Sequence, residues 1–192
     1  MANNNSTNKT QVKTKLVRFS YVHIFAPHAA NENADEKYSM SVIIPKSDKE
    51  TLAALKAAIE AAKEEGKASK WGGKIPANLK LPLRDGDEDR PDDAAYADSY
   101  FFNCSSNNKP LICNRNPADP VTEDDIYSGC YGRVVVRFYA FNQSGNKGIA
   151  AGLNAVQKIK DGERLGGSVV SADEFDDGFA DDFDDDDDGC LD

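Results

Sequence analysis

Cationic and aromatic side chains alternate with apolar ones in the stretch GRVVVRFYAF, residues 132–141. Because successive side chains of a strand point to opposite faces, Arg133, Arg137, Tyr139 and Phe141 share one face, and the other face is apolar. Arginines bind phosphates, and exposed rings stack on unpaired bases whatever the base. The first face therefore predicts a surface that binds single-stranded nucleic acid, and the second predicts core.

A second strand and a long loop supply more cations. The stretch VRFSY sets Arg18 beside aromatic residues, and a basic segment surrounds Trp71. For Trp71, Tyr139 and Phe141 two alternatives stay open, stacking on a base or packing into the protein. The complete predicted binding set for single-stranded DNA is Lys15, Arg18, Tyr21, Lys70, Trp71, Lys74, Lys80, Arg84, Arg133, Arg137, Tyr139, Phe141 and Lys147.

Motifs of catalysis and of metal binding are scarce. The chain has only His23 and His28 as histidines, and its four cysteines form no C-x-x-C pair, so a zinc site is not expected. Phosphate-binding and hydrolase motifs are absent. The acidic cluster that starts at Asp85 suggests a calcium loop, but its twelfth position is Tyr96 instead of Glu. We expect a protein without catalysis, cofactor or metal; a metal-dependent nuclease is the enzymatic alternative.

The elements that must position these side chains are mostly strands. Alternating patterns predict strands over residues 12–27, 37–45, 130–142 and 148–159, and a hairpin that joins 99–104 to 109–114. A capping box at Ser47–Glu50 and an apolar stripe predict a helix that ends at Gly66, and residues 67–98 read as a long irregular segment. The set predicts a mainly β fold, a small antiparallel barrel with one amphipathic helix.

Charge divides the chain into a body and an acidic tail. Ser171–Asp192 holds twelve Asp or Glu and no Lys or Arg, whereas the preceding residues hold all 23 Lys and Arg against 21 acids, a formal charge of +2. We expect a polar disordered leader over residues 1–11, a barrel domain over 12–167 and a disordered acidic tail over 168–192. The residues expected to bind partners are Phe175, Phe179, Phe183, Asp184, Asp185, Asp186, Asp187 and Asp188.

Three stretches in combination resemble a phage-encoded family: the segments 37–67, 74–93 and 127–163. That family, long catalogued as a domain of unknown function, is taken to comprise single-stranded DNA-binding replication proteins with an OB-like barrel. The similarity spans roughly residues 12–167. The acidic end is also similar to the tails of phage and bacterial single-strand binders, although those usually finish on an aromatic residue and this chain finishes Gly-Cys-Leu-Asp.

The resemblance implies a role in phage replication or recombination, in the cytoplasm of an infected bacterium. A tethered polyanion is held near the body at an effective concentration of order millimolar, so we expect the tail to compete with DNA for the basic surface and, once displaced, to recruit a polymerase, helicase or primase. No membrane association is expected, and a homo-oligomer stays open. The alternative from another class is an acidic interaction or DNA-mimic module that binds a basic partner and no DNA.

Overall fold

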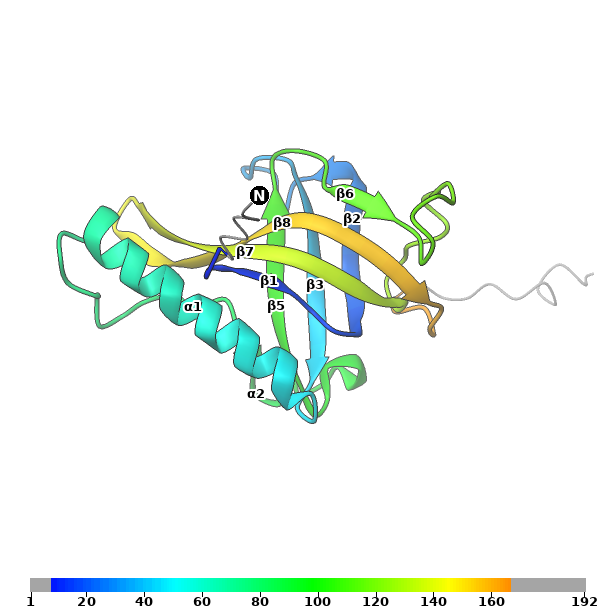
Figure 1. Ribbon diagram of the computed structural model, residues 1–192, viewed down its shortest axis with the longest axis horizontal. Helices are drawn as coiled ribbons and strands as arrows, with labels where there is room; N and C mark the ends of the chain where they lie inside the picture. Colours follow the sequence, from blue (N-terminus) through cyan, green and yellow to red (C-terminus); the bar gives the residue numbers. More distant parts are fainter. Residues whose placement is uncertain (1–7, 167–192) are drawn as a thin grey trace, which may run out of the picture.

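The computed structural model describes residues 8–166, which fold around one curved sheet (Figure 1). Its elements in chain order are β1 (Gln11–Lys13), β2 (Val17–His28), β3 (Lys37–Pro45), α1 (Lys49–Ser69), β4 (Arg84–Asp85), α2 (Gly86–Asp89), the 3-10 helix η1 (Ala94–Tyr96), β5 (Ser99–Ser106), β6 (Leu111–Cys113), β7 (Tyr131–Gln143) and β8 (Asn146–Lys160).

Five of the described strands close into a barrel. The hydrogen-bonded order runs β7-β2-β3-β5-β8, and β8 pairs with β7 again, which joins the two ends of the sheet. Neighbours in this ring are antiparallel except for β5 and β8, which are parallel at Ser105 and Gly152. The mainly β fold with one main helix is confirmed. A five-stranded closed ring is the arrangement expected of an OB-like barrel.

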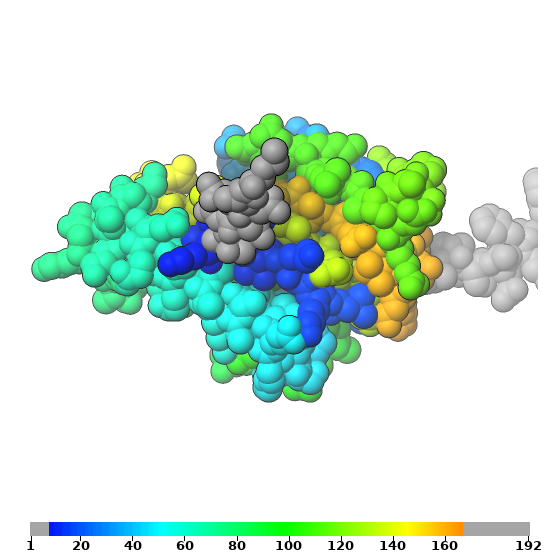
Figure 2. Space-filling model, viewed as in Figure 1, coloured from blue at the N-terminus to red at the C-terminus, as the bar shows by residue number. Residues whose placement is uncertain are grey.

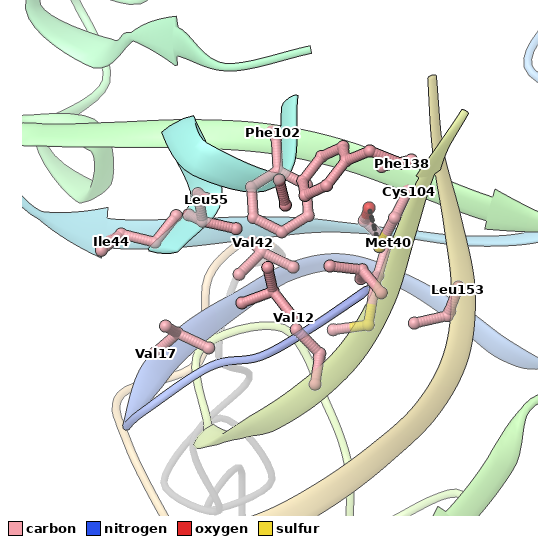
Figure 3. Packing of buried hydrophobic residues seen from close by; sticks show 14 of the residues in the cluster. Val12, Val17, Met40, Val42, Ile44, Leu55, Phe102, Cys104, Phe138 and Leu153 are labelled. Atoms are coloured by element: carbon pink, nitrogen blue, oxygen red, sulfur yellow. Dashed lines mark hydrogen bonds between the residues drawn. The ribbon is translucent and has the colours of Figure 1, made fainter. Parts of the chain in front are cut away.

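The barrel interior is filled by the apolar halves of the alternating strands (Figure 3). Val42, Phe102 and Val136 are fully buried there, and the Phe102 ring meets the Phe138 ring edge to face at 5.9 Å between centroids. The apolar stripe of α1 joins this same core through Leu52, Leu55, Ala58, Ile59 and Ala62. The predicted inward faces are therefore confirmed at these strands and at the helix.

Helix α1 begins and ends at other residues than its sequence signals suggest. Its N-cap is Asp48, whose side chain accepts a hydrogen bond from the Thr51 amide at 3.1 Å, and not Ser47. The helix also continues past Gly66 to Ser69, so the predicted end at Gly66 was wrong. Gly66 serves close packing instead, because a Cβ there would lie 2.4 Å from the Cβ of Ala140.

Strands β7 and β8 form one long ribbon, and α1 runs beside its distal part (Figure 1). They are joined at Ser144 and Gly145, both with positive φ, which confirms the predicted turn. On the face shown in Figure 2, residues of β1 and α1 lie side by side in front of this ribbon. Helix α1 and β1 therefore cover part of this face, while atoms of β8 stay visible beside them in Figure 2.

The predicted hairpin of residues 99–104 with 109–114 was wrong. Strand β3 occupies one edge of β5 along its whole length, and β4 and β8 share the other edge. No edge of β5 is left for β6, which pairs in parallel with β8 instead, Leu111 opposite Ala155. The long-range pairings thus exclude the local one.

Residues 67–98 are more ordered than their composition suggests. The segment contains β4, α2 and η1, and it buries Trp71 and Tyr96. The boundary of the body also moves at the N-terminus: Thr10 is fully buried and its carbonyl accepts from the Phe138 amide at 2.9 Å. Residues 8–11 therefore belong to the folded body and not to a disordered leader.

Candidate nucleic-acid interface

A groove of about 670 Å³ lies on the outer face of β2, β3 and β5. Its floor is built by the outward residues of β3 and β5, which alternate with the inward core residues Met40, Phe102 and Cys104. The outward set is small and polar: Ser39, Ser41, Asn103 and Ser105. In five-stranded OB barrels the face of the second and third barrel strands, here β3 and β5, is the one that binds oligonucleotides and oligosaccharides.

Tyr21 stands at the edge of this groove because β2 contains a bulge. The register of β2 with β3 shifts between Ser20 and His23, and Tyr21 there adopts φ 47°. Phe19 is fully buried before the bulge, and Ile24 is fully buried after it. Strict alternation would place Tyr21 on the same face as Phe19, but the extra residue turns its side chain outward, where 53% of the residue is exposed.

Arg90 borders the groove next to Tyr21. Its Nη1 donates to the Tyr21 hydroxyl at 3.1 Å, and its guanidinium lies 5.1 Å from the centroid of that ring. The same guanidinium lies 4.7 Å from Tyr96 and 5.5 Å from Phe101, two fully buried rings on the outer side of the sheet. Aromatic faces attract a cation, so these contacts hold the guanidinium at the groove.

Two histidines complete the groove wall. The rings of His23 and His28 stack with centroids 4.2 Å apart and planes 12° from parallel. Burial lowers the pKa of His23, because it disfavours a charged ring, and electrostatic repulsion from His28 lowers it further. At neutral pH His23 is therefore an uncharged flat ring that can donate or accept a hydrogen bond.

The outer face continues from the groove toward the predicted face of β7. Register pairs His23 with Ser39, Ser39 with Ser105, Ser105 with Gly152, and Gly152 with Arg137, in one row across the barrel. Two strand spacings, roughly 10 Å, separate Arg137 from Ser105. Arg137 is exposed and Tyr139 is 46% exposed. Both side chains are therefore accessible, as the predicted DNA contact requires.

The basic segment around Lys80 lies against the β7–β8 ribbon. The Lys80 amide donates to the Lys147 carbonyl at 3.0 Å, its Nζ donates to Asn146 at 3.0 Å, and Asn142 donates to the Lys70 carbonyl at 3.3 Å. Lys70, Lys74 and Lys80 are exposed, and Lys147 is half-buried. Three of these predicted cations, Lys70, Lys80 and Lys147, thus lie at the turn end of the β7–β8 ribbon.

Four other predicted cations lie away from the groove floor and bind the protein itself. Lys15 forms an ion pair with Glu50 of α1. Arg18 donates to the carbonyls of Gly129 and Glu163, and Arg133 donates to the Thr14 carbonyl at 3.1 Å. Arg84 lies over the Phe101 ring but pairs with Asp89 at 2.6 Å. The structure thus ties these four to internal partners.

Trp71 is not an exposed stacking ring. The residue is only 8% exposed, and its Nε1 donates to the Phe141 carbonyl at 3.2 Å. Its ring packs against the helix backbone at Gly66, where the missing Cβ leaves room. Of the two alternatives for Trp71, the structure supports the loop anchor, and Phe141 beside it is half-buried.

Two acidic residues of the cluster that starts at Asp85 have a structural partner. Asp85 and Asp87 both pair with Lys46, at 2.8 and 2.7 Å, and these carboxylates raise the pKa of that lysine. Across residues 8–166 no three His, Cys, Asp or Glu side chains gather as they would around a metal ion. In the same range no helix has the length and apolar character of a membrane span.

Sequence reasoning missed the histidine pair, the serine floor and Arg90. Arg90 stands between two acidic runs, which made its surroundings appear negative, although it is the one cation between Asp85 and Asp98. No local signal marked Arg90 for the groove, because an Arg among neighbouring carboxylates is expected to pair with them. The serines of β3 and β5 carried no signal either.

Fold and groove together place the chain in the class of small β-barrel proteins that bind extended polymers on a strand face. The chain belongs to the family described as Enterobacter phage Enc34, ssDNA-binding protein, whose model matches residues 10–188.

Individual relatives agree with this membership. A putative protein p50 of Acyrthosiphon pisum secondary endosymbiont phage 1 is 34% identical over 179 residues, covering 87% of this chain and 93% of the relative. The single-stranded DNA-binding protein of bacteriophage Enc34, solved in complex with ssDNA, is 28% identical with a TM-score of 0.70, covering 83% of this chain and 91% of that one. Gp2.5 of bacteriophage T7, a single-stranded DNA-binding protein, is 15% identical with a TM-score of 0.57 over 95% of this chain and 98% of its own, a likeness of fold.

Proposed function

We propose that this chain is a non-catalytic, sequence-independent single-stranded DNA-binding protein of a phage replication or recombination system. The observation that carries the proposal is the groove on β2, β3 and β5, where an exposed ring, a guanidinium and a polar floor occupy the binding face of an OB-like barrel. Family membership and the DNA complex of the Enc34 protein support the same conclusion.

The chemistry of the groove favours unpaired bases over a duplex. A protruding Tyr21 ring needs a free base face to stack on, which a single strand offers without the cost of opening a pair. On the floor, Ser39, Asn103 and Ser105 offer short polar contacts that suit any base, whereas Ser41 is buried and accepts a hydrogen bond from the Tyr96 hydroxyl. The row that leads to Arg137 and Tyr139 would carry the strand across β8 to a second cation and ring.

Binding to labelled oligo-dT at increasing salt tests this function. If about four phosphates are neutralised, the slope of log K against log salt is expected near −3 for a single strand. A duplex of equal length is the control and is expected to bind more weakly. Failure to bind oligo-dT at low salt would contradict the proposal and favour the acidic interaction or DNA-mimic module.

We extend the proposal to the acidic segment Ser171–Asp192, which lies outside the described residues. Leu165, one of the last described residues, packs against Ile43, Tyr96 and Phe101, the cluster on which Arg90 rests. The chain therefore leaves the body beside the groove, and the following carboxylates can compete with DNA phosphates for it. When DNA displaces them, they become available to basic surfaces of a polymerase, helicase or primase.

The absence of catalysis has its own test. Labelled single-stranded DNA incubated with the protein and magnesium is expected to stay intact, whereas a metal-dependent nuclease would shorten it and would lose this activity with EDTA.

A further inference from the structure

Tyr21 carries backbone strain at the bulge of β2. Only three non-glycine residues between 8 and 166 have positive φ, and Tyr21, at 47°, is the one among them with a large side chain. Such a conformation costs of order 1 kcal/mol or more for a bulky residue, and it persists where the surroundings or a function demand it. The result of this strain is a ring lifted out of the strand and left 53% exposed.

Arg90 holds that ring from a distant part of the chain. The two residues are 69 apart in sequence, and the Nη1 of Arg90 donates to the Tyr21 hydroxyl at 3.1 Å. The buried rings of Tyr96 and Phe101 fix the guanidinium from below, at 4.7 and 5.5 Å. The orientation of the exposed ring is thus set by a cation that is itself anchored in an aromatic cluster.

The guanidinium keeps unused binding capacity on its groove side. Within the part of the chain that the structure describes, its one side-chain hydrogen bond goes to Tyr21, and no carboxylate lies within 4.0 Å of it. A guanidinium has five N–H donors in a planar fork that suits phosphate oxygens. Arg84 differs, because Asp89 already neutralises it.

We propose that Tyr21 and Arg90 form one nucleotide seat: the Tyr21 ring stacks on an unpaired base, and the Arg90 guanidinium holds that ring and contacts the adjoining phosphate. This inference rests on the proposed function and deepens it. Arg90 then has two roles at one site. It positions the Tyr21 ring through the tyrosine hydroxyl, and it neutralises one phosphate charge of the DNA backbone.

Three variants of the full-length chain separate these roles in titrations of fluorescein-labelled dT oligonucleotide at several salt concentrations. Tyr21→Gly is expected to weaken binding roughly five- to hundredfold, the range of one stacked base, while its melting temperature stays near that of the wild type because Gly adopts positive φ without strain. Arg90→Met is expected to weaken binding and to reduce the steepness of the salt slope by about 0.7, one phosphate on a single strand.

Arg90→Lys distinguishes the two roles of this residue. Lysine keeps the charge and therefore the salt slope, but it lacks the fork, so affinity is expected to fall between those of the wild type and Arg90→Met. The matched control is Arg164→Met, because Arg164 also lies over a tyrosine, 4.2 Å from the Tyr127 ring, outside the groove lining. That control is expected to leave the salt slope unchanged.

Two failures are distinguishable. If the wild type binds dT with the expected salt slope, and Tyr21→Gly and Arg90→Met bind equally well with the same slope, the seat is wrong while the proposed function stands; loss of binding in Tyr139→Ala would then place the contact on β7. If the wild type does not bind dT at all, the proposed function itself fails. If Arg90→Met does not fold, an unaltered affinity in Tyr21→Gly alone overturns the seat.

Discussion

His23 lines two hollows of the surface, and burial decides its charge more than its neighbours do. The titratable and charged residues that line the groove with it are His28, Asp35, Lys37 and Arg90. Glu123 lines the second hollow, on the other side of His23. Burial is the larger cause of its lowered pKa, and His28 is the smaller. The folded state therefore disfavours the protonated imidazole more than the unfolded chain does.

This difference makes stability depend on pH in a known direction. The unfolded chain takes up the proton near the ordinary pKa of 6.5 and the folded chain takes it up at lower pH, so stability is full above 6.5 and falls as pH decreases below it. We expect a lower urea midpoint at pH 5.5 than at pH 7, because this group lowers the free energy of unfolding by at most about 1.4 kcal/mol per pH unit.

Substitution identifies the residue responsible. His23→Gln is expected to remove this dependence, and His28→Gln is expected to remove only the smaller part, because burial of His23 remains. Equal pH profiles in the wild type and His23→Gln would contradict the assignment.

At the scale of elements, the loop that follows α1 is held by Trp71. Its indole donates to the Phe141 carbonyl and packs on the helix, so it joins α1 to the β7–β8 ribbon. We expect Trp71→Phe to lower the free energy of unfolding by about 1 to 3 kcal/mol, because the carbonyl loses its donor. DNA affinity under folding conditions is expected to stay within about twofold.

The intrinsic fluorescence of Trp71 offers an independent check. A buried indole is expected to change its emission little on titration with oligo-dT. Strong quenching, together with a large loss of affinity in Trp71→Phe at unchanged stability, would return Trp71 to the set of stacking rings.

Gly66 tests the close approach of α1 to β7. In an exposed helix Gly→Ala stabilises by about 1 kcal/mol. Here the added Cβ would lie 2.4 Å from the Cβ of Ala140 and 3.0 Å from the Trp71 ring, so we expect a loss of about 1 to 3 kcal/mol from overpacking. Lys67→Ala, at the exposed neighbouring position, is the control and is expected to change the urea midpoint little. Stabilisation by Gly66→Ala would contradict the contact.

For the whole molecule, the separation of charge decides how DNA and the acidic tail compete. Deletion of Ser171–Asp192 removes twelve acids from a chain whose body carries about +2. We expect the truncated protein to bind oligo-dT more tightly at low salt, and the gain to shrink toward physiological and higher salt as screening shortens the reach of the charges.

A charge-only variant separates electrostatics from length. Replacing Asp184, Asp185, Asp186, Asp187 and Asp188 by Asn keeps the chain length and is expected to give part of the same gain in anisotropy titrations. Equal affinities for the full-length and truncated proteins at low salt would refute competition by the tail.

The sequence by itself determined the strands, the amphipathic helix, the β7–β8 turn and the outward face of Arg137 and Tyr139. These features depend on periods of two and 3.6 residues and on local turn chemistry, all of which can be read along the chain. Tyr21 was also predicted to bind DNA, from its type and its neighbours, and this stays a prediction; the structure shows that it is exposed.

The tertiary structure alone decided that Tyr21 is exposed, that Trp71 is buried and that Arg90 has no carboxylate partner among residues 8–166. The bulge at Tyr21 turned one ring outward, Gly66 and Ala140 made room to bury another at Trp71, and the aromatic cluster under Arg90 joined residues 69 apart. Closure of the barrel also gave both edges of β5 to other strands, which excluded its hairpin with β6. Each of these outcomes depends on contacts between distant segments, and local alternation carries no information about such contacts.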